Sequence, residues 1–173
     1  TMAGAFTNFF DDSLRARARR RGVSVHQVLT LASIIEAETS VDSERTRISG
    51  VYSNRLRKRM RLQADPTVQY ILEDGPRRLT YSDLYRPSAY NTYRNPGLPP
   101  GPINNPGRAS ILAAIVPEQH GFYFFVANGE GGHTFSRTYA DHLREVRKYQ
   151  RRRSAAAAAA RVELSKDTLP KDT

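Results

Sequence analysis

The strongest constraint on the fold is a long segment at residues 90–107, YNTYRNPGLPPGPINNPG, which consists almost entirely of turn-forming and hydrogen-bonding residues. Proline fixes φ and lacks a backbone donor, glycine permits positive φ, and asparagine bonds to its own neighbourhood. Loops of this length are uncommon inside compact domains unless they are functional or disordered. Tyrosines and asparagines in a proline-stiffened frame favour an ordered loop that faces a ligand. A plain connector is the alternative.

Composition and charge leave few classes of site open. The chain has 173 residues, enough for one domain, and no cysteine, which excludes disulfides and thiolate metal sites. Its formal charge of +10 suits nucleic acid, an anionic membrane face or an anionic cell-wall polymer, although it can equally reflect a solvated arginine-rich surface.

We expect a lead-in segment at 1–23, the main domain at 24–153, and a disordered alanine-rich and polar tail at 154–173.

Helix start signals predict the first elements of the main domain. Ser24 and Gln27 have the spacing of a capping box, and apolar residues then recur at helical intervals to about Thr39. A second helix is expected to begin near Asp42, with an apolar stripe that reaches Met60 and a basic opposite face.

Two Asx-Pro pairs predict later helices, because proline is favoured at the first helical position after a capping residue. Asp65 with Pro66 should start a helix that ends at Gly75, and Asn105 with Pro106 should start another. A short helical turn is expected at 82–84.

The end of the chain predicts strands and a last helix. Residues 122–128, FYFFVAN, are aromatic and β-branched, and GEGG then turns the chain into a partner strand at 133–137. A final helix should run from Tyr139 to about Arg153. The predicted fold is therefore α+β, a mostly helical domain with a small antiparallel β-hairpin and a long ordered Pro/Asn/Gly loop lining a cleft.

Two carboxylates in the first predicted helix are candidates for chemistry. Glu38 lies three residues after Ile35 and four after Ile34, so it shares the apolar face, whereas Glu36 points about 200° away. A carboxylate desolvated on an apolar face has a raised pKa and can donate a proton at neutral pH. Helix geometry therefore favours Glu38 over Glu36, and a structural glutamate paired with arginine is the alternative.

Other polar residues could line a site. Gln63 and Asp65 precede a predicted helix, where Asp65 would also serve as the N-cap. His133 follows two glycines, which allow close backbone approach to a ligand, although a lone histidine is more often structural. The sequence has no metal-ligand spacing, phosphate loop or dinucleotide fingerprint.

Four blocks of the sequence resemble the endolytic murein transglycosylases, the YceG-like family. They are ASIIEAET, SNRLRKRMRLQADPTVQY, PSAYNTYRNPGLPPGPINNPG and FYFFVANGEGGHTFSRTYADH, in the family's order between residues 28 and 149. The resemblance implies cleavage of nascent peptidoglycan between N-acetylmuramic acid and N-acetylglucosamine, with a 1,6-anhydro end and no cofactor. The glutamate directly before threonine in the first block maps to Glu38 as the catalytic residue. The resemblance also implies substrate contacts from polar residues of these blocks, namely Glu36, Gln63, Asp65, Tyr90, Asn91, Thr92, Tyr93 and His133.

Family resemblance further implies partners and a location. Members carry an N-terminal membrane helix and a small LysM-like module, so the first residues, TMAGAFTNFF, are interpreted as an excision point. The implied location is the bacterial cell membrane, with the catalytic domain on the extracytoplasmic side. The implied partners are peptidoglycan strands and the synthases of the cell wall. A non-catalytic glycan-binding module or scaffold is the alternative. Nucleic acid is not expected, because the aromatic residues do not alternate with the basic runs.

Overall fold

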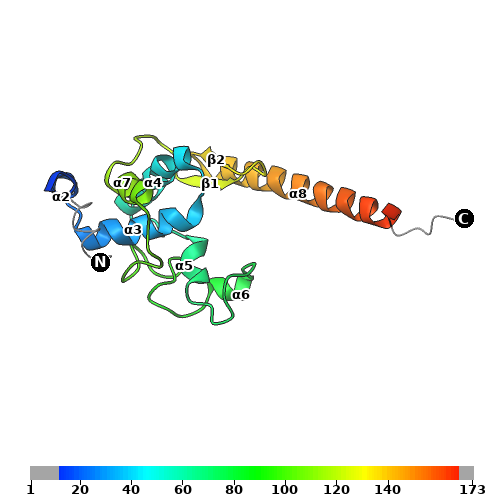
Figure 1. Cartoon of the computed structure of the whole chain (residues 1–173), viewed down its shortest axis with the longest axis horizontal. Helices are drawn as coiled ribbons and strands as arrows, with labels where there is room; N and C mark the ends of the chain where they lie inside the picture. Colours follow the sequence, from blue (N-terminus) through cyan, green and yellow to red (C-terminus); the bar gives the residue numbers. More distant parts are fainter. Residues whose placement is uncertain (1–11, 168–173) are drawn as a thin grey trace, which may run out of the picture. The chain divides into compact units, whose positions relative to one another are not determined.

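A computed structural model describes residues 12–167, excluding the side chains of Ala160 and of residues 162–167. The protein has an α+β fold in which helices predominate, and this confirms the predicted class (Figure 1). The elements in chain order are α2 (Asp12–Arg20), α3 (Val25–Glu38), α4 (Asp42–Arg57), α5 (Asp65–Gln69), α6 (Tyr81–Leu84), α7 (Arg108–Ile115), β1 (Phe124–Ala127), β2 (His133–Ser136) and α8 (Tyr139–Asp167). They form two compact units, Thr1–Gly121 and Phe122–Thr173. The domain boundaries expected from the sequence stay a prediction.

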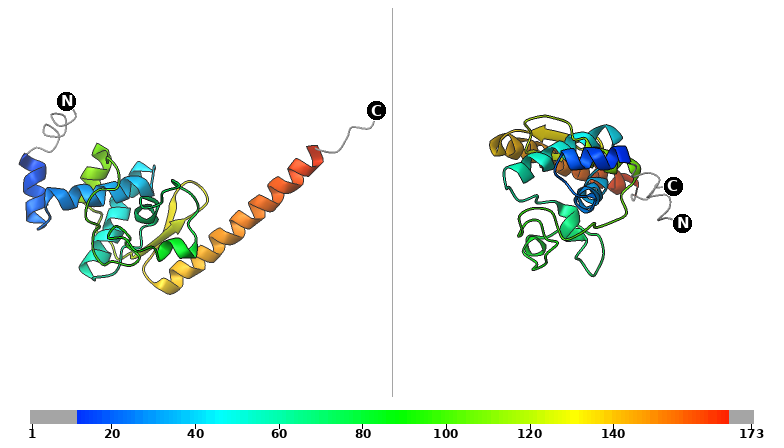
Figure 2. Two further views of the ribbon diagram at one scale, coloured as in Figure 1. Left: turned by 90° about the horizontal axis from the view of Figure 1, so that it is seen from below. Right: turned by 90° about the vertical axis from the view of Figure 1, so that its left-hand side faces the viewer.

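Helix α3 is the centre of the first unit and packs against α4, α5 and α7 (Figures 1 and 2). Its start confirms the predicted capping box, since Ser24 Oγ accepts from the Gln27 N–H and the Gln27 side chain accepts from the Ser24 N–H. The core around α3 consists of buried aliphatic side chains, among them Val28, Ile34, Ile35, Ile48, Val51, Ile111 and Ile115. Burial of this apolar surface stabilises the unit and fixes where the end of α3 lies.

Helix α4 begins at Asp42 as predicted but ends earlier than its apolar stripe suggested. The helix stops at Arg57, and Arg59 takes a left-handed φ of 55°. Met60 therefore lies outside the helix. The buried side of α4 carries Ile48, Val51 and Tyr52.

The predicted boundaries of α5 and α7 were wrong. Ala64, not Asp65, is the N-cap of α5, because the Asp65 carboxylate accepts a hydrogen bond from Tyr93 instead of capping the helix. The helix ends at Gln69, well before Gly75, and the Gln69 amide bonds both the N–H and the carbonyl of Arg77. Likewise α7 begins only after Gly107, whose N–H donates to Glu36.

The second unit contains the predicted hairpin and α8. Strands β1 and β2 pair antiparallel in the register Phe125↔Phe135 and Ala127↔His133. Gly129 and Gly131 take φ of 85° and 89° in the turn, as glycine allows. The helix runs on through six alanines to Asp167, past the predicted end near Arg153, because alanine has the highest helix propensity.

Candidate active site

Glu38 is the last residue of α3, and its carboxylate meets the buried side of α4. The phenol of Tyr52 on α4 donates a short hydrogen bond to Glu38 Oε1. Burial raises the pKa of Glu38 from 4.5 to about 7, and the nearby negative charge of Asp65 acts in the same direction. The Tyr52 hydrogen bond and the Arg55 charge oppose this rise without cancelling it. At neutral pH the Glu38 carboxyl therefore exchanges readily between its acid and base forms.

Arg55 supplies a buried positive charge near Glu38. Its side chain is 7% exposed, and its guanidinium donates to the Leu62 carbonyl at 2.6 Å. Burial lowers the pKa of Arg55, while the charges of the surrounding acidic groups raise it. This arginine therefore fixes the 61–62 backbone and lowers the pKa of Glu38 from a distance.

Asp65 and Tyr93 form a second polar pair beside Glu38. The Tyr93 phenol donates to Asp65 Oδ1 at 2.5 Å. Burial, the Asp65 hydrogen bond and the charges of Asp65 and Glu38 all raise the pKa of Tyr93, so it remains a protonated donor. Asp65 acts electrostatically on Glu38 and Tyr93, and Glu38 acts on Tyr52. The Glu38 and Asp65 carboxyls and the Tyr52 and Tyr93 phenols therefore lie in one site.

Thr92 joins the long loop to the segment before α5. Its buried Oγ1 accepts from the Ala64 N–H at 3.0 Å and shares a hydrogen bond with Thr67 Oγ1 at 2.9 Å. Its carbonyl accepts from the Gln63 N–H at 3.2 Å. Gln63 has a left-handed φ of 47°, a conformation that costs a non-glycine residue energy and often occurs at functional sites. Its exposed side chain is free to reach a ligand.

Asn91 lies inside the loop and not on its surface. The side chain is completely buried, and Nδ2 donates to the carbonyls of Leu84 and Arg86. Its Oδ1 accepts from the Tyr93 N–H at 2.9 Å. These contacts hold the loop in shape and orient Tyr93, so direct contact between Asn91 and a substrate stays a prediction.

Glu36 has structural partners on three sides. Its Oε2 accepts from Ser110 Oγ at 2.6 Å, from the Gly107 N–H at 3.3 Å and from Arg45 Nη1 at 3.3 Å. The carboxylate thus lies at the start of α7, where negative charge is favourable. Glu36 thus joins α3, α4 and α7 through these contacts.

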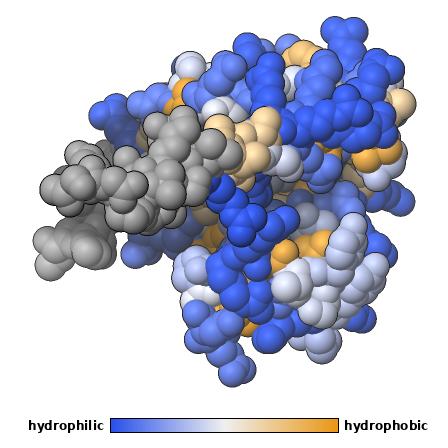
Figure 3. Space-filling view, turned by 90° about the vertical axis from the view of Figure 1, so that its right-hand side faces the viewer, coloured by the Kyte–Doolittle hydropathy of each residue, from blue (hydrophilic) through white to orange (hydrophobic). Residues whose placement is uncertain are grey.

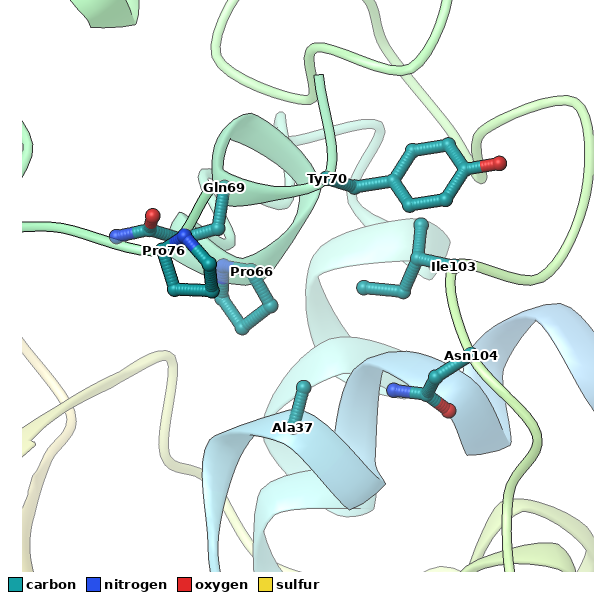
Figure 4. A pocket seen from close by; sticks show the side chains of 7 residues that line it. All are labelled: Ala37, Pro66, Gln69, Tyr70, Pro76, Ile103 and Asn104. Carbon is teal, nitrogen blue, oxygen red and sulfur yellow. The ribbon is translucent and has the colours of Figure 1, made fainter. Parts of the chain in front are cut away.

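A pocket of about 320 Å³ lies between the end of α3, α5 and the long loop. Ala37 and Pro66, the direct neighbours of Glu38 and Asp65, line it together with Tyr70 and Ile103 (Figure 4). Tyr70 also packs against Tyr90 of the loop, with ring centroids 4.9 Å apart. The long loop therefore lines a pocket with its Ile103 end, and that it faces a ligand stays a prediction.

The structure brings together some of the predicted site residues. Glu38, Asp65, Tyr93 and the Gln63 backbone belong to one connected region of the first unit. His133 belongs to the second unit, where its ring packs edge-on against Phe125 at 5.3 Å, and its approach to Glu38 stays a prediction. Sequence reasoning missed Tyr52 and Arg55 as site residues. The signal that could have indicated Tyr52 was the presence of a phenol within the apolar stripe of α4.

No helix in the described part of the chain combines the length and apolar character needed to cross a membrane. Among the side chains that the structure describes, no His, Asp and Glu residues cluster in a way that could hold a metal ion. The face seen in Figure 3 is mostly hydrophilic, as the charge of +10 leads one to expect.

Comparison with known proteins gives consistent matches. The family model described as the YceG-like family matches residues 1–148. The chain is 41% identical over 143 residues to the endolytic murein transglycosylase of Bacillus subtilis (strain 168), covering 83% of this chain and 40% of the relative. It is 31% identical over 134 residues to that of Streptococcus pneumoniae (strain D39), covering 74% of this chain and 24% of the relative. The chain thus spans less than half the length of these relatives.

A solved structure also resembles this one. It is the 2.6 Å crystal structure of a YceG-like protein from Listeria monocytogenes, with 44% sequence identity and a TM-score of 0.71. The similarity covers 77% of this chain and 43% of that chain.

Proposed function

The chain belongs to the YceG-like family, and from this membership and the environment of Glu38 we propose that it is a lytic transglycosylase that cleaves murein glycan strands. The observation that carries the proposal is a half-buried carboxyl with a pKa of about 7 at the end of α3. A group of this kind is protonated in a large fraction of molecules at neutral pH and can act as a general acid.

The proposed reaction breaks the β-1,4 bond between N-acetylmuramic acid and N-acetylglucosamine. Glu38 gives its proton to the glycosidic oxygen as the bond from the muramic acid C1 breaks. The 6-hydroxyl of the same muramic acid then bonds to C1, and Glu38 takes the proton that this hydroxyl loses. The products are a 1,6-anhydro end and a free 4-hydroxyl, and Glu38 returns to its starting form.

One carboxyl is sufficient for this sequence of steps. Glycosidases with two carboxyls use the second one to activate water or to attack the anomeric carbon. Here the nucleophile is already attached to the substrate, so proximity replaces the second group. That Glu36 is bonded to Ser110 and Arg45 is compatible with a single catalytic carboxyl.

The remaining polar groups would bind and orient the sugar. The Tyr93–Asp65 pair offers hydrogen bonds and a negative charge that would favour the positive charge developing at C1. Gln63, Tyr90 and, from the second unit, His133 are proposed to contact the N-acetyl groups and hydroxyls. Thr92, Asn91 and Glu36 would act by holding the backbone that carries these residues.

The proposed setting is the bacterial cell membrane, with this part of the protein on the extracytoplasmic side. Nascent peptidoglycan strands are available there, and cell-wall synthases are candidate partners because they produce the strands that such an enzyme would end. These proposals rest on family membership.

A non-catalytic peptidoglycan-binding domain is the second candidate. The basic surface would serve such a domain equally well, since its charge of +10 favours anionic polymers. The raised pKa of Glu38 favours the enzyme, because a binding module gains nothing from burying an acid.

The discriminating experiment is mass spectrometry of peptidoglycan digests made in water labelled with heavy oxygen. A lytic transglycosylase gives 1,6-anhydro-muramyl ends that contain no label, whereas a hydrolase gives labelled reducing ends. The matched control is Glu38→Gln, which should release neither product. Binding of strands without any new ends would instead support the scaffold.

A further inference from the structure

Tyr52 is a polar residue in an otherwise apolar part of the core. It lies on α4 with Ile48 and Val51, is 1% exposed, and its hydroxyl reaches Glu38 Oε1. Tyrosine hydroxyls that are buried usually have a specific partner, because an unpaired buried hydroxyl is costly. Here the partner is the residue to which we assign proton transfer.

We propose that Tyr52 is a positioning residue that holds Oε1 of Glu38 and thereby directs the catalytic proton to Oε2. This inference rests on the proposed function. Oε1 of Glu38 accepts the hydrogen bond from the Tyr52 phenol. A carboxyl whose Oε1 accepts from a phenol carries its own proton on the other oxygen, where a substrate could receive it.

The surroundings keep the Tyr52 phenol a donor in both states of Glu38. Burial and the neighbouring Glu38 charge raise the pKa of Tyr52 well above its ordinary value, and the Arg55 charge only partly offsets this. Tyr52 therefore cannot take over the proton itself. Its contribution is to stabilise the Glu38 anion that exists after the proton has left, in a fixed orientation.

The charged and titratable groups around Glu38 come from three segments. Tyr52 and Arg55 on α4 favour the ionised form of Glu38, and Asp65 at the start of α5 disfavours it. Tyr93 of the loop interacts electrostatically with Glu38 but donates its hydrogen bond to Asp65. Removing the Tyr52 hydroxyl should therefore raise the pKa of Glu38 and favour its protonated form.

The test is Tyr52→Phe, which keeps the ring and removes the hydroxyl. The alkaline limb of the pH–rate profile should move to higher pH by about one unit, the value for loss of a hydrogen bond to a charged group. At the optimum, kcat should fall by about tenfold with little change in KM, because Tyr52 is buried and does not touch the substrate. A titration of the Glu38 carboxyl carbon by NMR should show the same shift without any substrate.

Ser49→Ala is the matched control. Ser49 lies on the same helix, is fully buried and has an Oγ without a hydrogen-bond partner. Loss of this hydroxyl should leave both the pH profile and the Glu38 titration unchanged. An equal shift in both variants would overturn the proposal, because it would reflect general loosening of α4.

Replacement of Tyr52 by 3-fluorotyrosine tests the opposite direction and also covers the case in which Tyr52→Phe does not fold. The fluorinated phenol is more acidic and donates more strongly, so the alkaline limb and the Glu38 titration should move to lower pH. No movement in either folded variant would refute the role of Tyr52. If the carboxyl titration moves as expected but no variant, nor the unmodified protein, cleaves glycan, the proposed function fails and the Tyr52–Glu38 contact stands.

Discussion

The Tyr93 phenol donates a 2.5 Å hydrogen bond to the Asp65 carboxylate, which joins the long loop to the first residue of α5 across 28 positions of sequence. Thr92, the preceding residue, bonds the Ala64 N–H and the Thr67 hydroxyl of the same segment. The loop and α5 therefore form one rigid side of the region that contains Glu38. Tyr93 and Asp65 would therefore serve the chemistry, whereas Thr92 holds the loop.

Tyr93→Phe should lower activity with little effect on folding. The substitution removes the hydroxyl that orients Asp65 but keeps the half-buried ring, so we expect a loss of about tenfold in kcat/KM. Steady-state kinetics and thermal unfolding on the same preparations check this. Tyr81→Phe is the control, since Tyr81 is 85% exposed. A Tm loss as large as that of a core variant would show that the hydroxyl serves mainly the fold.

Substitution of the two glutamates should give opposite results. Glu38→Gln keeps the shape and hydrogen bonding but removes proton transfer, so turnover should fall by about a hundredfold or more. Glu36→Gln weakens the contacts with Arg45, Ser110 and Gly107 and should reduce stability by about 1–3 kcal/mol while activity of the folded fraction persists. Anhydro-end assays and urea unfolding separate these effects. A dead Glu36→Gln beside an active Glu38→Gln would reverse the assignment.

Local sequence rules predicted the parts of this fold in which neighbours in sequence decide the structure. The Ser24–Gln27 capping box and the β-hairpin are of this kind, and both are present. The helical spacing of Glu38 with Ile34 and Ile35 also predicted that desolvation would raise the pKa of this carboxyl. In these cases the interactions lie within about four residues or across one turn.

Distant contacts decided the features that were missed. Asp65 was expected to cap α5, but Tyr93 occupies its carboxylate, and no local pattern contains that contact. Tyr52 was not predicted as a site residue, since its distance from Glu38 depends on how α4 packs against α3.

Asn91→Ala should therefore destabilise the protein, contrary to the expectation for an exposed loop residue. The substitution removes an amide that bonds two carbonyls and one N–H, and it leaves the buried partners unsatisfied. A loss of about 2–4 kcal/mol is expected, at the upper end for single substitutions. Urea unfolding measures it, and Asn105→Ala, at an exposed loop position, is the comparison. Normal stability together with lost activity would instead indicate that Asn91 contacts the substrate.

His133→Ala should reduce activity moderately and leave folding normal. The ring is half-buried on β2 and packs edge-on against Phe125, so its removal costs limited core contact. If the imidazole orients the sugar, kcat/KM should fall by about tenfold. Thr134→Ala on the same strand is the control for the hairpin. Wild-type kinetics in His133→Ala would remove this residue from the site.

The burial of Glu38 should also appear in the pH dependence of stability. Below pH 4.5 the carboxyl is protonated in both the folded and the unfolded chain and contributes no difference. Between pH 4.5 and about 7 the unfolded chain loses its proton while the folded protein keeps it, so the free energy of unfolding falls as pH rises. At about 1.4 kcal/mol per pKa unit, the decrease from this group reaches about 3 kcal/mol. Glu38→Gln cannot titrate, so its stability relative to wild type should increase across this window and then level off. Urea unfolding of both proteins at several pH values measures this difference, which cancels the other titrating groups. A difference that is constant with pH, or that changes in the opposite direction, would mean that the Glu38 carboxyl is not desolvated.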